Sequence, residues 1–204
     1  MNFSSLPKTI SKQWKQISSF EFTRLRLLDA DSSVMLLTSL IVGICSGVGA
    51  VLFRRLIDWL QNLAYQDISG LMQEYYPLHL ILIPAIGGAF VGPLIYYFAR
   101  EAKGHGVPEV MESLELRGGR IRPRVVVVKS LASSICIASG GSVGREGPIA
   151  QIGSALGSIV GQVLKLSADR VRTLVACGAA GGIAATFNAP IAGAIFALEV
   201  LLRR

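Results

Sequence analysis

Two short glycine-rich segments, each ending in a proline, carry the residue types best suited to hold a small anion. They are Gly104-His105-Gly106-Val107-Pro108 and Gly144-Arg145-Glu146-Gly147-Pro148. Proline is favoured in the first turn of a helix, so each segment is expected to lead into a helix. A helix start presents unpaired backbone N–H groups and about half a positive charge, and glycine lets an ion approach the backbone closely. The two segments therefore predict an anion-binding site at two helix N-termini.

Glu146 is the ionisable residue with the most suggestive surroundings, because it lies between glycines and apolar runs. Such a side chain is costly in a membrane unless it has a task. Deprotonated, it would cap the helix that starts near Pro148 and exclude an anion. Protonated, it would lose that attraction and swing away, so one group would couple protonation to an anion path. The alternative is a simple ion pair with Arg145 at a membrane interface, and the sequence leaves both interpretations open.

Three other polar residues are weaker candidates for a functional role. For His105, a polar loop position is the simpler interpretation, and an N–H donor aimed at an anion is the functional one. Lys129 interrupts an apolar run, and we expect it to snorkel to the surface or to pair. Glu199 is a candidate for a local ion pair with Arg203 at i, i+4, or for a functional acid inside the membrane.

The elements that must position these residues are membrane helices. Of the 204 residues, 51% are hydrophobic and only 16% are charged, and the mean hydropathy is +0.53. Twenty uncharged residues from Val34 to Phe53 are long enough to cross a bilayer as a helix, and Leu78–Phe98 forms a second such run. Lysines and arginines before the first run predict a cytoplasmic N-terminus, with residues 54–77 between the two spans on the outer side.

The rest of the chain predicts helices that are short or interrupted. A polar stretch before Val125 predicts a short, re-entrant helix from Pro108, and apolar segments follow over Val125–Val143 and Pro148–Leu164. The last apolar run, Thr173–Leu198, is broken at Asn188-Ala189-Pro190. We therefore expect an all-α, polytopic membrane protein with broken and re-entrant helices. Residues 1–32 would form a cytoplasmic tail and residues 33–204 a partial transmembrane domain.

Composition also argues against several classes of protein. The net charge of +7 is spread between long uncharged runs, so nucleic-acid binding is not expected. Two histidines are too few for a histidine-built metal site, and we expect no metal and no cofactor. The three cysteines lie in apolar stretches without ligand spacing and are expected to be free, buried thiols. An enzyme that uses the glycine segments for phosphate is disfavoured, because no GK[ST] motif or nucleophile–base pair accompanies them.

The two glycine segments occur together with FNAPIAGAIFALEV, from Phe187 to Val200. In this order and spacing they resemble the CLC family of chloride channels and chloride/proton exchangers. The resemblance implies inverted repeats, broken helices whose N-termini point at a central chloride site, and a two-pore homodimer in the lipid bilayer. It implies that Glu146 is the gating glutamate. It also implies an anion-binding role for the remaining residues of the two segments, which are Gly104, His105, Gly106, Val107, Pro108, Gly144, Arg145, Gly147 and Pro148.

Departures from the family pattern refine these expectations. His105 stands where many members have a serine that contacts the anion. Exchangers commonly carry an inner proton-transfer glutamate immediately after the position of Glu199, where this chain has Val200. The resemblance therefore favours passive anion permeation over coupled exchange. Pro148 is retained, which disfavours the fluoride-selective branch.

The resemblance covers Val34 to Leu202, which is the first part of the family core. The sequence thus predicts an N-terminal part of a CLC-type channel, truncated before the second repeat. A coupled chloride/proton antiporter and a non-conducting assembly fragment remain the alternatives.

Overall fold

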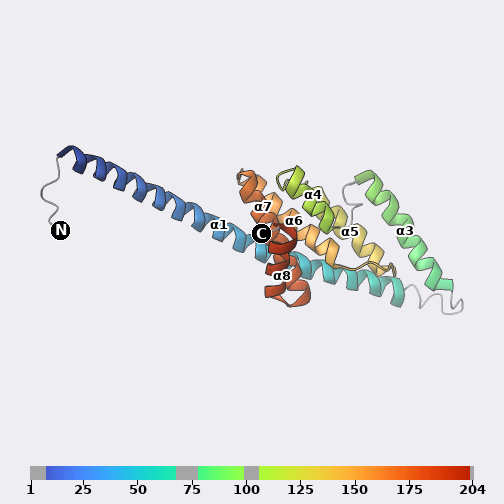
Figure 1. The fold of residues 1–204 in the computed structure, drawn as a ribbon. Coiled ribbons are helices and arrows are strands. Elements are labelled where there is room, and N and C mark those ends of the chain that lie inside the picture. The colour runs from blue at the N-terminus through green and yellow to red at the C-terminus, as the bar shows by residue number, and fades with distance from the viewer. Residues whose placement is uncertain (1–7, 68–77, 99–105, 203–204) are drawn as a thin grey trace. The chain divides into compact units, whose positions relative to one another are not determined.

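The computed structural model describes residues 8–67, 78–98 and 106–202, and it describes side chains within 32–65, 81–98 and 106–202. The described residues form helices and no strands (Figure 1). In chain order the helices are α1 (Lys8–Asn62), the π-helical turn η2 (Leu63–Asp67), α3 (Leu78–Phe98), α4 (Val107–Leu116), α5 (Arg124–Ala138), α6 (Glu146–Val163), α7 (Ala168–Phe187), α8 (Pro190–Phe196) and the π-helical turn η5 (Ala197–Leu201). The predicted all-α class is confirmed.

The chain divides into two compact units, Met1–Thr38 and Ser39–Arg204. In the first unit, the Thr38 hydroxyl bonds to the backbone of its own helix, at the carbonyl oxygens of Val34 and Met35. All of the candidate site residues belong to the second unit.

Two helices have the length and composition needed to cross a membrane, over Ser32–Tyr65 and Ile81–Phe98. Only 28% and 11% of their most apolar windows are buried inside the protein. The core helix of a water-soluble protein would bury such a surface, so the exposure favours contact with lipid. The first span includes the predicted run Val34–Phe53 but continues to Tyr65, and α3 has the predicted bounds.

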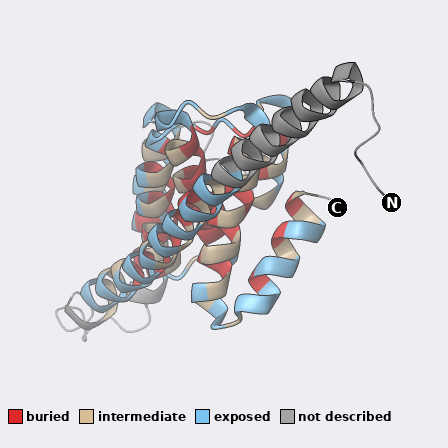
Figure 2. Ribbon diagram, turned by 90° about the vertical axis from the view of Figure 1, so that its left-hand side faces the viewer, coloured by how far each residue is buried: buried red, intermediate tan, exposed pale blue. Residues whose placement is uncertain are grey.

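The interior is built around the contact between α6 and α7, which is the most extensive among the described elements. Glycines permit this close approach, because a Cβ atom at Gly153 would collide with the backbone of Gly178. The hydroxyl of Ser46, on α1, adds a hydrogen bond to the carbonyl oxygen of Gly178. Figure 2 shows buried residues gathered on the inner faces of the helices, while much of α1 beyond residue 31 is exposed.

The break predicted in the last apolar run is confirmed. Asn188 ends α7 in the left-handed conformation, with φ 53°, and α8 begins at Pro190. Asparagine tolerates this conformation, and proline cannot continue the hydrogen bonding of the preceding helix. The two residues therefore convert one apolar run into two helices.

The cysteine prediction is half right. Cys45, Cys136 and Cys177 are all free, as expected. Cys45, however, is exposed, and the other two are only partly buried. An apolar sequence context predicted burial, but Cys45 lies on α1, a helix that presents much of its apolar surface outward.

Candidate functional site

The first glycine segment leads into α4 as predicted. Gly106 precedes the helix with φ 85° and ψ −85°, a conformation that side chains with a Cβ rarely adopt. Pro108 lies in the first turn, and no side chain caps the helix. The hydrogen bond nearest the start runs from Val110 N–H to Gly106 O, at 3.1 Å. The earlier N–H groups of the helix have no partner within it, which is the condition for attracting an anion.

The second glycine segment leads into α6 in the same way. Arg145 is the N-cap residue, Glu146 is the first helical residue, and again no side chain caps the helix. The bond nearest the start runs from Ile149 N–H to Arg145 O, at 3.1 Å. Pro148, in the first turn, has no N–H group to satisfy, which suits this position.

The fold brings these two helix starts together. A Cβ atom added to Gly106 would lie 2.5 Å from the carbonyl oxygen of Gly147 and 2.8 Å from its Cα atom. Only glycine at position 106 allows the backbones of the two segments, about forty residues apart in sequence, to meet this closely. The predicted pairing of two uncapped helix N-termini is therefore present in the structure.

Glu146 is exposed, and its carboxylate folds back over Gly144, where Oε2 occupies the space that a Cβ atom would need. Among the described residues it has no ion pair with Arg145, which is half-buried. The arrangement therefore does not favour the interpretation of Glu146 as a simple ion-pair partner. It leaves a carboxylate at the start of α6 that is held by no side chain of the described chain.

The opposite ends of α4 and α6 are firmly fixed. The buried hydroxyl of Ser158 donates to Gly119 O at 2.6 Å and accepts from Ile121 N–H at 2.8 Å. The side-chain amide of Gln162 donates to Ile121 O at 2.9 Å and to Ser158 Oγ at 2.8 Å. These bonds anchor the loop after α4 on the last turns of α6.

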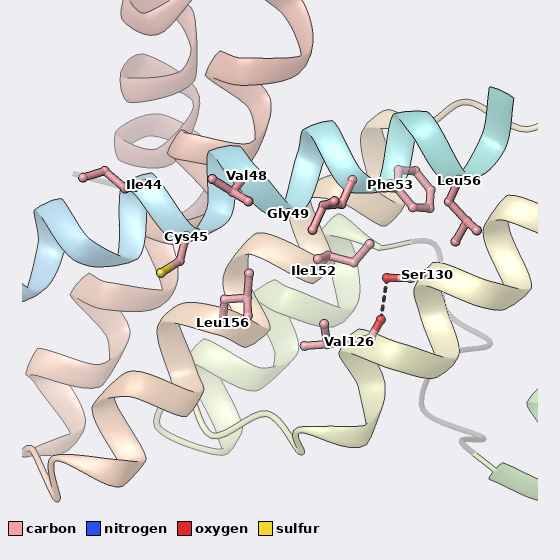
Figure 3. A pocket seen from close by; sticks show the side chains of 11 residues that line it. Ile44, Cys45, Val48, Gly49, Phe53, Leu56, Val126, Ser130, Ile152 and Leu156 are labelled. Carbon is pink, nitrogen blue, oxygen red and sulfur yellow. Dashed lines mark hydrogen bonds between the residues drawn. The ribbon is translucent and has the colours of Figure 1, made fainter. Parts of the chain in front are cut away.

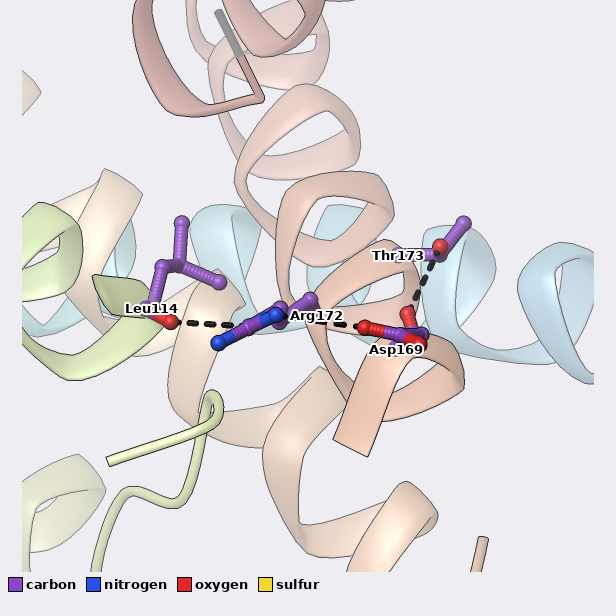
Figure 4. Close-up of polar contacts among 4 residues, drawn as sticks. All are labelled: Leu114, Asp169, Arg172 and Thr173. Atoms are coloured by element: carbon purple, nitrogen blue, oxygen red, sulfur yellow. Dashed lines mark hydrogen bonds and ion pairs between the residues drawn. The ribbon is translucent and has the colours of Figure 1, made fainter. Parts of the chain in front are cut away.

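The guanidinium group of Arg172 caps the C-terminal end of α4 (Figure 4). Arg172 Nε, on α7, donates to Leu114 O at 2.9 Å, and the same guanidinium contacts Asp169 at 3.1 Å. Positive charge stabilises a helix C-terminus, where carbonyl oxygens lack partners. The start of α4 is thus positioned by contacts made at its far end.

The other candidates fall in two places, outside the described residues and on η5. Gly104 and His105 lie outside the described residues. Glu199 is exposed and Val200 partly buried on η5, an element that packs against α4 and α7. Arg203, the expected partner of Glu199, also lies outside the described part of the chain. Val107 and Met111 of α4 pack on the core cluster that includes Ala197 and Leu201 of η5.

The structure distinguishes between the two arrangements predicted for Lys129, which are snorkelling to the surface and pairing. Lys129 is only 7% exposed, so the prediction that it snorkels to the surface of this chain is wrong. It interacts electrostatically with Glu109, in the first turn of α4. This interaction favours the pairing interpretation. The sequence signals were a lysine inside an apolar run and an acid just after a helix start, but their distance apart hid the partnership.

A cavity away from the two helix starts is lined by side chains that do not suit an ion. It has a volume of 450 Å³ and lies between α1, α5 and α6, with side chains from all three helices pointing toward it (Figure 3). Its lining is apolar apart from Cys45 and Ser130, and the Ser130 hydroxyl already bonds to Val126 O at 2.6 Å. No group of three or more metal-binding side chains was found among the described residues.

Comparisons with known proteins agree on one family. The family model described as "Voltage gated chloride channel" matches residues 87–204. A ClcB-like protein of Ralstonia nicotianae is 33% identical over 174 residues, covering 82% of this chain and 41% of that protein. The "H(+)/Cl(-) exchange transporter ClcA" of Citrobacter koseri is 39% identical over 189 residues, covering 85% of this chain and 38% of the relative.

The solved structures give the same result. A slow cyanobacterial Cl⁻/H⁺ antiporter superposes with a TM-score of 0.70 at 28% identity, covering 82% of this chain and 40% of that one. The chain therefore spans about two fifths of the length of the relatives it matches.

Proposed function

Because the chain belongs to the voltage gated chloride channel family, the CLC family of membrane proteins, we propose that it serves chloride transport across a membrane. The transported anion passes the paired starts of α4 and α6. The residues that bind it are the backbone and side chains of the two glycine segments, including Gly104 and His105. Neither an enzyme activity nor a cofactor is part of this proposal.

One observation carries the proposal: two uncapped helix N-termini meet at Gly106 and Gly147. Each contributes unpaired N–H groups and about half a positive charge. Their sum attracts a small anion. Binding by dipoles is moderate, and an ion that must leave quickly needs moderate binding.

Glu146 is the gate in this proposal. Its carboxylate sits at the start of α6, where it competes with an anion for the same N–H groups. Protonation removes that competition. The position of the side chain over Gly144 and its lack of an ion pair with Arg145 support a group that is free to move.

The proposed mode is passive, gated permeation, and the support comes from Val200. A valine cannot carry a proton, and it occupies the place where exchangers of the family commonly have a glutamate. Coupled exchange is the second candidate, favoured by the names of ClcA and of the cyanobacterial antiporter. Since both relatives are named for proton exchange, the two modes need a direct test.

For the membrane arrangement, we propose a multi-pass protein with a cytoplasmic N-terminus that assembles as a homodimer. The support is the basic residues before the first apolar run and the two exposed apolar helices. If the chain acts without further segments, a non-conducting assembly role is the alternative.

Anion efflux from liposomes, recorded together with proton movement, tests the proposal. The protein is reconstituted at its full natural length and, separately, as the 204-residue chain. Chloride efflux without proton movement supports a channel, and a fixed ratio of protons to chloride supports exchange. Absence of chloride flux from the full-length protein contradicts the proposed function. Flux from the full-length protein but not from the 204-residue chain supports the assembly role for the isolated chain.

A further inference from the structure

The apolar cavity between α1, α5 and α6 is an extension of the exposed apolar surface of α1 into the protein (Figure 3). On α1, the lining residues Ile44, Val48 and Leu52 are each more than half exposed. Phe53 and Ile152, which also line the cavity, are buried. The cavity is therefore a groove with an exposed apolar rim and a buried apolar floor, and we refer to it as the α1 groove.

The lining of the α1 groove suits a hydrocarbon chain better than a polar ligand. A site for a polar small molecule offers a few donors or acceptors that orient it. Here the hydroxyl of Ser130 already donates to Val126 O at 2.6 Å, and the thiol of Cys45 is a weak donor. Because lipid tails are as apolar as leucine, a chain is held in such a groove by van der Waals contacts with its walls.

The length of the α1 groove matches one leaflet of a bilayer. Its lining on α1 runs from Ile44 to Leu56, which is about 18 Å of helix. Half of a hydrocarbon core is about 15 Å. Trp59 is 61% exposed and follows Leu56 by three residues on the same face of α1. Tryptophan is enriched at the membrane–water interface, so the groove extends from that interface toward the middle of the membrane.

A positive charge lies at the interfacial end of the α1 groove. Arg54 and Arg55 are exposed, and neither forms an ion pair with Asp58 or another acid in the described part of the chain. Arg55 follows Leu52 by three residues and precedes Trp59 by four, spacings that place helical residues on one face. Arg54 has no lining residue at these spacings. The guanidinium group of Arg55 is therefore the one placed to meet a phosphate, which it can bind through two parallel hydrogen bonds.

We propose that the α1 groove binds one acyl chain of an anionic phospholipid, whose phosphate is held by Arg55 and whose head group lies at the level of Trp59. Three helices supply contacts along the chain, and the arginine supplies attraction for the charge of the head group. The bound chain fills the space between α1 and the pair α5 and α6, and so joins the first membrane span to the helices behind it. This inference depends on insertion in a membrane and not on the transport of chloride.

The occupant of the groove is tested with phosphatidylglycerol that carries a photoreactive group on its acyl chain. The full-length protein is reconstituted in liposomes, and cross-links are mapped by mass spectrometry. They are expected at Ile152 and Leu156, on the α6 wall of the groove. Val48→Trp places a larger side chain in the groove and is expected to lower these cross-links by at least about fivefold.

Val51→Trp is the matched control for Val48→Trp. Val51 lies on the same helix and is 50% exposed, against 54% for Val48, but it does not line the groove. The cross-links at Ile152 and Leu156 are expected to stay at the wild-type level in Val51→Trp.

The head group is tested with Arg55→Gln and Arg54→Gln, which change the net charge equally. Native mass spectrometry of the full-length protein measures the affinity for phosphatidylglycerol and for phosphatidylcholine. Arg55→Gln is expected to weaken the binding of phosphatidylglycerol by about fivefold, the effect of one basic residue near a membrane surface. Arg54→Gln is expected to weaken it by less than about twofold, and neither variant should change the binding of phosphatidylcholine.

Three results would overturn the inference. Absence of cross-links at Ile152 and Leu156 in the wild-type protein would show that the groove holds something else, such as a further polypeptide segment. Equal losses in Val48→Trp and Val51→Trp would show that the chain does not lie in the groove. Equal effects of Arg54→Gln and Arg55→Gln would show that the phosphate is not held by Arg55. Chloride efflux from the same liposomes tests the proposed function separately.

Discussion

The two ends of α4 and α6 are built in opposite ways. At their starts, neither helix has a side-chain cap, glycine backbones touch, and the Glu146 carboxylate has no described partner. At their far ends, Ser158, Gln162 and Arg172 hold the loop after α4 and its last carbonyl groups. Unpaired donors are tolerated where an anion is expected, and the bonds that fix the helices are made elsewhere. The groups proposed to bind the anion are thus separate from the groups that stabilise the two helices.

The largest effect is expected from a substitution that disturbs the close contact between the starts of α4 and α6. Gly106→Ala places a Cβ atom against the carbonyl of Gly147 at a residue with φ 85°. Backbone strain and the displaced helix start are expected to lower chloride flux by at least about tenfold. Efflux from liposomes measures this.

Gly118→Ala is the matched control at the far end of α4. Its φ is 59°, and its nearest neighbour would be the methyl group of Ala168 at 3.2 Å. It is expected to reduce stability while keeping most of the flux per folded protein. Equal losses of chloride flux in Gly106→Ala and Gly118→Ala would contradict the proposed difference in function between the start and the far end of α4.

Next in size is the effect of removing the charge at the start of α6. Glu146→Gln can neither compete with the anion as a carboxylate nor change its protonation. We expect most of the dependence of gating on external pH to disappear, as measured by current or efflux across a series of pH values. Glu112→Gln, at an exposed acid on α4 that pairs with Arg117, is expected to keep the pH dependence. A wild-type pH profile in Glu146→Gln would refute the gating role.

A smaller effect, on stability alone, is expected at the far end of α6. Ser158→Ala leaves the buried groups of Gly119 and Ile121 without their partner, at a cost of about 1–3 kcal/mol in the free energy of unfolding. Ser154 is equally buried, but its hydroxyl has no hydrogen-bond partner, so Ser154→Ala is expected to be neutral or stabilising. The free energies of unfolding of both variants are measured in detergent and compared with that of the wild-type protein. If Ser154→Ala costs as much as Ser158→Ala, the hydrogen bonds are not the cause.

The smallest effect is expected at the surface end of α4. Arg172→Gln removes the bond to Leu114 O and the contact with Asp169. Because the arginine is 39% exposed, water replaces part of what is lost, and we expect a cost of about 0.5–1 kcal/mol. Arg117→Gln breaks a pair with Glu112 whose side chains are 54% and 51% exposed, and it should have no measurable effect on unfolding. A large loss of chloride flux in Arg172→Gln, without loss of stability, would show that the far end also takes part in transport.

The sequence by itself determined the features that depend on neighbours along the chain. The bounds of α3, the proline-led starts of α4 and α6, and the break at Asn188 follow from local propensities and from runs of apolar residues. The family was also recognisable, because its motifs are short and local. These properties need no knowledge of how the helices pack.

Only the tertiary structure decided which distant residues meet. The contact between Gly106 and Gly147 and the anchoring of the loop on Ser158 join residues 37 to 41 positions apart. The exposure of Cys45 was also missed, since an apolar run does not reveal which face of its helix turns toward the protein. Local sequence fixes helices because their hydrogen bonds are local, whereas the partners across helices depend on packing, which involves the whole chain.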